Sequence, residues 1–196
     1  MMSGSRRLAL SALVVGLVAW IAGQATYARF GVTTDNQGNS FAAGNVAISD
    51  NDSGGAVVTL TNALPGASAS GCIAVTYNGS LDSQVHLYGS VSGGLASYLN
   101  LRITRGTNGS PFNSCAGFTA DATNYIGQGA GVVYDGDLSA LPSTYAAGIV
   151  DAPGSPETWS SGESHAYRLQ VTFKAGSVGA DGLAASATFT WEARSL

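Results

Sequence analysis

The fold follows from one stretch of the chain, His165-Ala166-Tyr167-Arg168-Leu169-Gln170-Val171-Thr172-Phe173, in which bulky side chains recur at every second position. Alternation at period two is typical of a β-strand with one buried face, because successive side chains point to opposite sides of a strand. The stretch therefore predicts a strand whose inner face is formed by His165, Tyr167, Leu169, Val171 and Phe173.

The same alternation recurs through the chain and predicts about eight strands, at residues 45–49, 56–60, 72–77, 84–92, 98–105, 131–135, 165–173 and 187–193. The first two flank a polar turn and predict a hairpin. Residues 137–145 predict no more than a helical turn. A parallel sheet needs crossover helices, and the spacers lack helical periodicity. We therefore expect an all-β fold, an antiparallel β-sandwich of jelly-roll or other Greek-key type.

The first 28 residues have the three parts of a secretory signal peptide. Arg6 and Arg7 precede an apolar run of sixteen residues, and small residues lie at the −3 and −1 positions of a cut between Ala28 and Arg29. The run is shorter than the roughly 20 residues of a spanning helix, although a retained anchor stays the alternative. Both the general secretory pathway and a twin-arginine pathway remain open for export.

This organisation predicts a cleaved signal over 1–28, an N-terminal segment and linker over 29–39, and one β-sandwich domain over 40–196. The mature chain keeps six basic residues against twelve acidic ones and has no basic patch. We therefore expect no nucleic-acid partner, and no membrane partner after signal cleavage. The expected location is extracellular, in solution or at the cell surface.

Two cysteines, Cys72 and Cys115, predict one disulfide in an exported chain, closing a loop of 43 residues. The Gly-, Asn- and Ser-rich stretch between Gly106 and Gly131 contains Cys115 and predicts a long surface connection held by that bond. A nucleophilic thiol is the alternative, but it requires a positioned base, and no residue near either cysteine suggests one.

No catalytic motif and no cofactor motif is evident in the sequence. The zinc-protease pattern His-Glu-x-x-His is absent, and His86 and His165 are the only histidines. Each lies inside a predicted strand, so we expect half-buried strand residues; they would be the only imidazole ligands of a metal if their strands adjoined. The Asp50–Gly54 stretch spaces its oxygens as calcium loops do, but a plain turn explains it equally well.

An ordered set of short motifs spans nearly the whole mature chain and resembles the TasA/camelysin family, whose members carry SipW-type signal peptides. The motifs are Thr26-Tyr27-Ala28-Arg29-Phe30, Asn39-Ser40-Phe41-Ala42-Ala43-Gly44-Asn45-Val46, the Asp50 to Gly55 loop, Leu64-Pro65-Gly66, Asn78-Gly79-Ser80-Leu81, Tyr134-Asp135-Gly136-Asp137-Leu138 before Leu141, Trp159 with Gly162-Glu163, the Tyr167 to Phe173 strand and Phe189-Thr190-Trp191-Glu192-Ala193. The resemblance implies a jelly-roll subunit of secreted biofilm-matrix fibres, in which the N-terminal segment of one subunit pairs with the next subunit's sheet.

Members named camelysin have been classed as metallopeptidases, an activity that the missing zinc motif leaves unsupported here. The cysteine pair also departs from the fibre-forming members, so it leaves polymerisation open.

Residues 29–34 are the predicted donor strand, because Phe30 and Val32 form a small apolar face and residues 35–39 form a polar tether. Pairing of this strand with another copy's sheet edge would be head-to-tail and would build filaments. The alternative is that residues 29–34 fold back as an ordinary edge strand.

Three functions are therefore compatible with the sequence. The first is a non-enzymatic structural protein of the extracellular matrix or cell surface that associates with itself by strand addition. The second is a camelysin-like metallopeptidase that uses His86 and His165. The third is a carbohydrate- or protein-binding sandwich with stacking surfaces from Tyr125, Tyr134, Tyr145 and Trp159.

Overall fold

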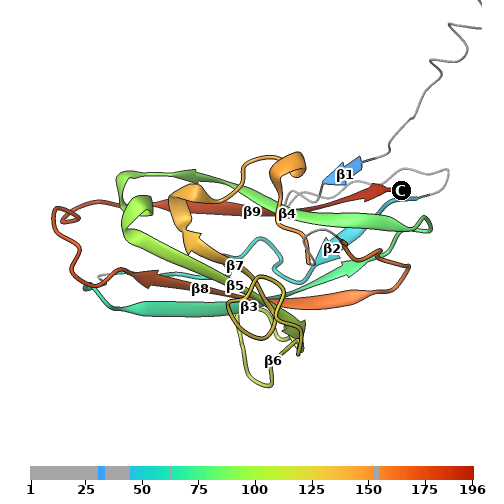
Figure 1. Cartoon of the computed structure of the whole chain (residues 1–196), viewed down its shortest axis with the longest axis horizontal. Helices are drawn as coiled ribbons and strands as arrows, with labels where there is room; N and C mark the ends of the chain where they lie inside the picture. The colour runs from blue at the N-terminus through green and yellow to red at the C-terminus, as the bar shows by residue number, and fades with distance from the viewer. Residues whose placement is uncertain (1–30, 34–44, 62, 152–154) are drawn as a thin grey trace, which may run out of the picture.

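The computed structural model describes residues 31–33, 45–61, 63–151 and 155–196, and these form a sandwich of two antiparallel sheets (Figure 1). One sheet has the order β1-β9-β4, with β1 at Gly31–Thr33, β9 at Ser186–Ser195 and β4 at Ser83–Ser92. The other has the order β2-β3-β8-β5-β6, and β7 also pairs with β5. Its strands are β2 (Ile48–Asp50), β3 (Ser68–Tyr77), β8 (Ser164–Phe173), β5 (Leu99–Thr107), β6 (Thr119–Ala120) and β7 (Val132–Asp137).

The all-β prediction is confirmed. Short 3-10 turns are the only helical elements in the described part of the chain: η1 (Gly94–Tyr98), η2 (Leu138–Ala140) and η3 (Tyr145–Ala147). One of them, η2, lies inside the 137–145 range where the sequence predicted a helical turn, and η3 begins at the last residue of that range. Among the described residues, no helix is long and apolar enough to cross a bilayer.

The core lies between the sheets and is built from the alternating positions that the sequence predicted. Each long strand contributes inward side chains that are almost completely shielded from solvent, among them Ile73, Val75, Tyr77, Leu101, Ile103, Tyr167, Leu169 and Trp191. Burial of apolar surface contributes roughly 25 cal/mol per Å², so this layer supplies most of the stabilisation of the fold.

The jelly-roll class stays a prediction. The chain crosses between the two sheets from β3 to β4, from β4 to β5 and from β8 to β9, whereas β5 and β8 are neighbours in one sheet. On the side of β4 away from β9, Ile149 forms an isolated antiparallel bridge with Leu87.

The predicted hairpin of residues 45–49 and 56–60 is wrong. Ile48 pairs with Tyr77 of β3, and residues 56–60 form no strand. Residues 56–58 run instead against the inner face of β3, where a Cβ on Gly71 would lie 1.7 Å from the carbonyl oxygen of Val57. Val57, Val58 and Leu60 pack against the core there, which explains why this stretch is apolar without being a strand.

The long connection after β5 crosses the outer face of its sheet and is bonded to β3. Cys72 and Cys115 form a disulfide with a Cα–Cα distance of 5.1 Å, as the sequence predicted. The backbone N–H of Asn113 donates to the carbonyl of Cys72 (2.9 Å), and Asn51 accepts from the N–H of Ala74 (2.9 Å). The connection therefore covers the edge of β3, the usual way in which natural sheets blunt an edge strand.

Several predictions fall outside the described residues. These are the signal peptide, its cleavage between Ala28 and Arg29, Phe30 and the tether at 35–39.

Candidate functional site

The most open feature of the fold is one edge of β9. This strand pairs with β4 along its whole length, but on its other side it pairs with β1 only at Glu192, Ala193 and Arg194. In the part of the chain that the structure describes, the Ser186–Trp191 stretch has no strand on that side. Among the described residues, β3 is covered at its edge and the Ser186–Trp191 stretch of β9 is not, so the two sheets differ there in their capacity to accept another strand.

The hydrogen-bonding groups on this edge can be assigned from the pairing. Leu87 and Gly89 of β4 direct their backbone N–H groups away from β9, to Ile149 (2.9 Å) and Pro142 (2.8 Å). Their opposite residues on β9 are Trp191 and Phe189. In an antiparallel pair, a residue facing such a position also turns its N–H and C=O away from the partner strand.

Three residues of β9 therefore present their backbone N–H and C=O groups to the open edge. They are Phe189, Trp191 and, by the same alternation, Ala187.

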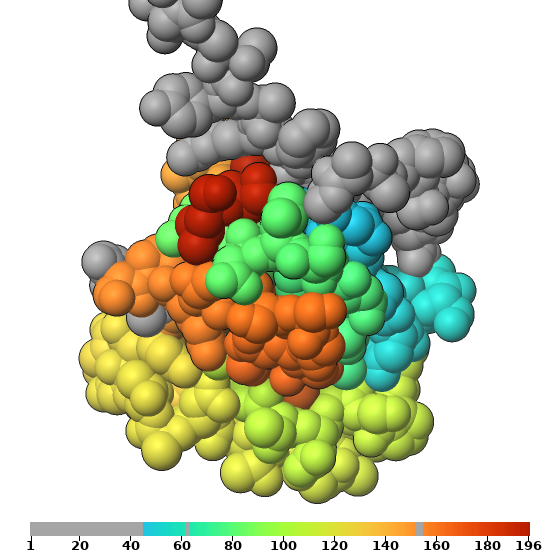
Figure 2. Space-filling model, turned by 90° about the vertical axis from the view of Figure 1, so that its right-hand side faces the viewer, coloured from blue at the N-terminus to red at the C-terminus, as the bar shows by residue number. Residues whose placement is uncertain are grey.

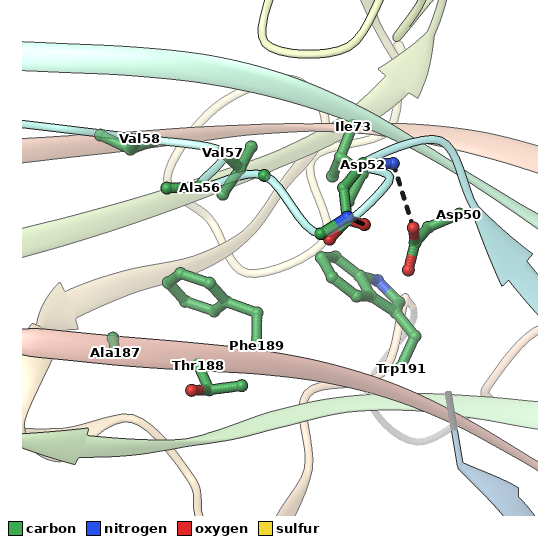
Figure 3. Close-up of a pocket in the computed structure, with 12 residues that line it drawn as sticks. Asp50, Asp52, Ala56, Val57, Val58, Ile73, Ala187, Thr188, Phe189 and Trp191 are labelled. Carbon is green, nitrogen blue, oxygen red and sulfur yellow. Dashed lines mark hydrogen bonds between the residues drawn. The ribbon is translucent and has the colours of Figure 1, made fainter. Parts of the chain in front are cut away.

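A pocket of about 290 Å³ lies directly beside this edge, between β9 and the 50–58 segment (Figure 3). Phe189 and Trp191 point from β9 toward Val57 and Ile73 on the opposite side. The pocket thus has an apolar floor and wall. Its polar end is formed by the carboxyl groups of Asp50, the last residue of β2, and Asp52, two residues further on in the turn after β2.

The two carboxyl groups at this pocket have no cationic partner among the described residues. Asp50 accepts a hydrogen bond from the N–H of Asp52 (3.1 Å), and Asp52 accepts one from the N–H of Gly54 (2.7 Å). Burial raises the pKa of Asp50, and the neighbouring Asp52 carboxyl raises it further. The indole Nε1 of Trp191 is buried at the same pocket and has no hydrogen-bond partner in the described residues.

A second polar cluster lies between the sheets at the end of the sandwich where β8 begins. Arg105 of β5 is only 5% exposed, and its guanidinium contacts the carboxylates of Asp121 (3.0 Å), Asp151 (2.5 Å) and Glu157. The indole N–H of Trp159 donates to Asp151 (3.2 Å). Figure 2 views this end, where the orange segment leading into β8 lies beside the yellow segment after β6.

Burial and the neighbouring charges shift the pKa values of groups in this cluster. Burial raises the pKa of Asp151, although Arg105 and His165 act in the opposite direction. Burial and the hydrogen bond to Asp121 raise the pKa of Tyr125 to about 12. Four acidic groups surround one guanidinium when Glu163 is included, so charge ties two connections, the one after β6 and the one before β8, to the end of the sheet.

Within this cluster, Glu157, Glu163 and His165 offer ligand atoms that lie within 4.8 Å of one another. This is the group among the described residues whose donor atoms could hold a metal ion. However, the Nη2 of Arg105 lies 3.3 Å from the Nε2 of His165. A guanidinium beside the ligand atom opposes a divalent cation by charge repulsion.

The strands of His86 and His165 do not adjoin, because β4 and β8 belong to different sheets, and the group of possible metal ligands around His165 does not include His86. His86 stacks on Tyr145 with ring centroids 3.9 Å apart, and its Nδ1 lies 2.8 Å from the Tyr145 carbonyl oxygen. The pair that sequence reasoning offered to a metallopeptidase is therefore not assembled. His165 is accompanied by two glutamates that the sequence reasoning did not connect with it.

The four aromatic residues considered for carbohydrate stacking have separate environments. Trp159 is 1% exposed, so a stacking role for it is wrong. Tyr145 lies against His86 and the Arg194 guanidinium, which is 3.9 Å from its ring centroid. Tyr125 donates to Asp121, and Tyr134 donates to the Asp137 carbonyl (2.9 Å).

No protein-family model and no curated protein matches this chain. The site must therefore be interpreted from its own chemistry.

Proposed function

We propose that this is an exported, non-enzymatic structural protein, similar to TasA, whose subunits associate by adding a strand to the open edge of β9. The observation that carries the proposal is this edge, where Ala187, Phe189 and Trp191 present their backbone groups beside an apolar groove. The disulfide is consistent with an oxidising, extracellular location.

Strand addition is physically favourable at this edge. Each main-chain hydrogen bond contributes about 0.5–1.5 kcal/mol net, and an incoming strand can form several with the three edge residues. Alternate side chains of that strand point into the groove beside Phe189 and Trp191. Phe30 and Val32 have the alternation that this groove requires.

Within one chain, β1 lies antiparallel on its own β9, with Val32 opposite Ala193. The fold-back arrangement that sequence reasoning kept as an alternative is thus the arrangement of the single subunit. Donation to a neighbour then requires β1 to leave its own β9, after which the freed segment pairs with the open Ala187–Trp191 stretch of another copy. Head-to-tail pairing of this kind does not close, so it extends into a filament.

The proposal is tested with Ala187→Pro in the mature chain, residues 29–196. Proline removes the N–H that faces the open edge and leaves the bonds between β4 and β9 intact. Sedimentation velocity and electron microscopy should show polymers for the wild-type chain and monomers for Ala187→Pro. Ala187→Val is the matched control, since it keeps the N–H and should still polymerise.

Deletion of residues 29–38 tests the donor independently and should also leave monomers. A wild-type chain that stays monomeric at all concentrations, or an Ala187→Pro variant that polymerises like it, would refute strand addition at β9.

A further inference from the structure

We propose that the pocket formed by Asp50, Asp52, Phe189 and Trp191 is a binding site for an organic cation, an ammonium or guanidinium group carried on an apolar stem. This inference concerns a ligand and does not require that the subunits polymerise.

The first argument is the uncompensated charge of the pocket. Every other described Asp or Glu in the interior clusters has a cation nearby, such as Arg105 for Asp151 or Arg194 for Glu192. Asp50 and Asp52 are half-buried, lie two residues apart and have no ion pair with a described residue. Two partly desolvated carboxylates facing one cavity favour a positively charged occupant.

The second argument is the aromatic side of the pocket. Trp191 is 3% exposed, and its Nε1 has no hydrogen-bond partner among the described residues. In Figure 3 this nitrogen lies on the side of the ring nearer Asp50. An ammonium or guanidinium group has no acceptor to offer this N–H, so the N–H serves as a reporter of what enters the cavity. The contribution of the aromatic side to binding comes from the ring faces of Trp191 and Phe189, which attract a cation.

The third argument is the size and the composition of the wall. A volume of about 290 Å³ is close to the lower limit of small-molecule sites and suits one aliphatic amine or one Lys or Arg side chain. Val57, Val58 and Ala187 provide contact for the stem.

Calcium fits this pocket less well. The amide of Asn51 is already bonded to the N–H of Ala74 and the carbonyl of Gly109, so Asp50 and Asp52 are the side chains that supply oxygens to the cavity. Calcium takes six to eight oxygen ligands, which two carboxyl groups do not provide.

The test follows the indole N–H signal of Trp191 by NMR in the mature chain and in the chain that lacks residues 29–38, which keeps every pocket residue, with Trp191→Phe to assign the signal. The probes are n-butylamine and n-butylguanidine, with n-butanol as the neutral isostere. We expect saturable shifts for the two cations and none for the alcohol. An N-acetylated peptide of residues 29–34, compared with the same peptide carrying Arg29→Gln, tests for a protein-borne guanidinium: shifts with the arginine peptide alone identify one, and shifts with neither peptide leave the free amine as the ligand.

Asp50→Asn combined with Asp52→Asn should weaken cation binding at least tenfold, since each lost charge removes a charge-assisted contact. Asparagine keeps the oxygens that accept from Asp52 and Gly54, so the turn should fold, and thermal unfolding checks this. Asp181→Asn, at an exposed carboxyl outside the pocket, is the matched control and should bind like the wild type. Equal binding by the double variant, equal shifts with the alcohol, or a response to calcium alone would overturn the proposal.

Discussion

Arg105→Met is the substitution that tests most directly how the end of the sandwich is held together. Methionine preserves most of the volume of the side chain and removes the guanidinium that Asp121, Asp151 and Glu157 share in this cluster, the Arg105 cluster. The Arg105 and Asp151 side chains are 6% and 7% exposed, so Asp151 would be left as a buried carboxyl without its ion-pair partner. Asp121 and Glu157 would lose the same partner.

The expected loss is about 3–5 kcal/mol at pH 7, the range measured when one member of a buried ion pair is removed. For a domain of this size, each kcal/mol corresponds to about 2–4 °C in the unfolding midpoint, so we expect a decrease of about 6–20 °C. Arg102→Met is the control substitution, because it removes the cation of a more exposed ion pair. Arg102 and Asp135 are 36% and 22% exposed, so that pair should contribute about 1 kcal/mol or less.

The loss of stability caused by Arg105→Met should also depend on pH. Burial already raises the pKa of Asp151, and removal of Arg105 takes away the interaction that lowers it. A carboxyl with a raised pKa in the folded state destabilises the fold above that pKa, and the penalty falls as the carboxyl becomes protonated. The difference between wild type and Arg105→Met should therefore be smaller at pH 5 than at pH 7.

Urea unfolding followed by tryptophan fluorescence, at both pH values and under oxidising conditions, measures these quantities. A loss below 1 kcal/mol at pH 7, or a loss that grows on acidification, would refute the idea that Arg105 neutralises buried carboxylates.

Three further predictions concern stability and can be measured by the same unfolding experiment. Replacing Cys72 and Cys115 together by alanine should cost about 4 kcal/mol, because the bond closes a 43-residue loop; an unchanged midpoint would contradict this. Gly71→Ala should cost at least about 1–3 kcal/mol, since its Cβ would overlap the Val57 carbonyl, whereas Gly94→Ala is the control, because a Cβ there comes no closer than 3.4 Å to the Leu183 side chain. Trp159→Phe should cost about 1–3 kcal/mol by leaving Asp151 with one hydrogen bond fewer.

The alternation of side chains predicted the long strands well, because a buried face leaves a clear trace at period two. It failed at residues 56–60, where apolar residues cover the core edge without pairing their backbone. Hydrophobicity reports burial, and only the main-chain path decides whether a buried stretch is a strand. The Gly at position 71, which makes room for the Val57 carbonyl, is the local signal of that path.

The Arg105 cluster could have been found in part. Leu99, Leu101 and Ile103 alternate inward, and continuing that alternation places Arg105 on the inner face. A charged residue at an inward position requires buried partners of opposite charge. Which acids supply them depends on loops that are far apart in sequence, so Asp121, Asp151 and Glu157 could not be assigned from the sequence. The pocket at β9 was missed for the same reason.

The connection bonded through Cys115 has a consequence for where the protein can assemble. Its cover keeps the margin of β3 closed, so under the proposed strand addition an oxidised subunit has one receptive side and should grow as a linear chain. Without the bond, the cover would be held by hydrogen bonds and by the packing of Phe112 against the core. If that cover then opened, a subunit with two receptive sides would cross-link in place of extending, so the proposal predicts ordered growth from the oxidised form and not from the reduced one.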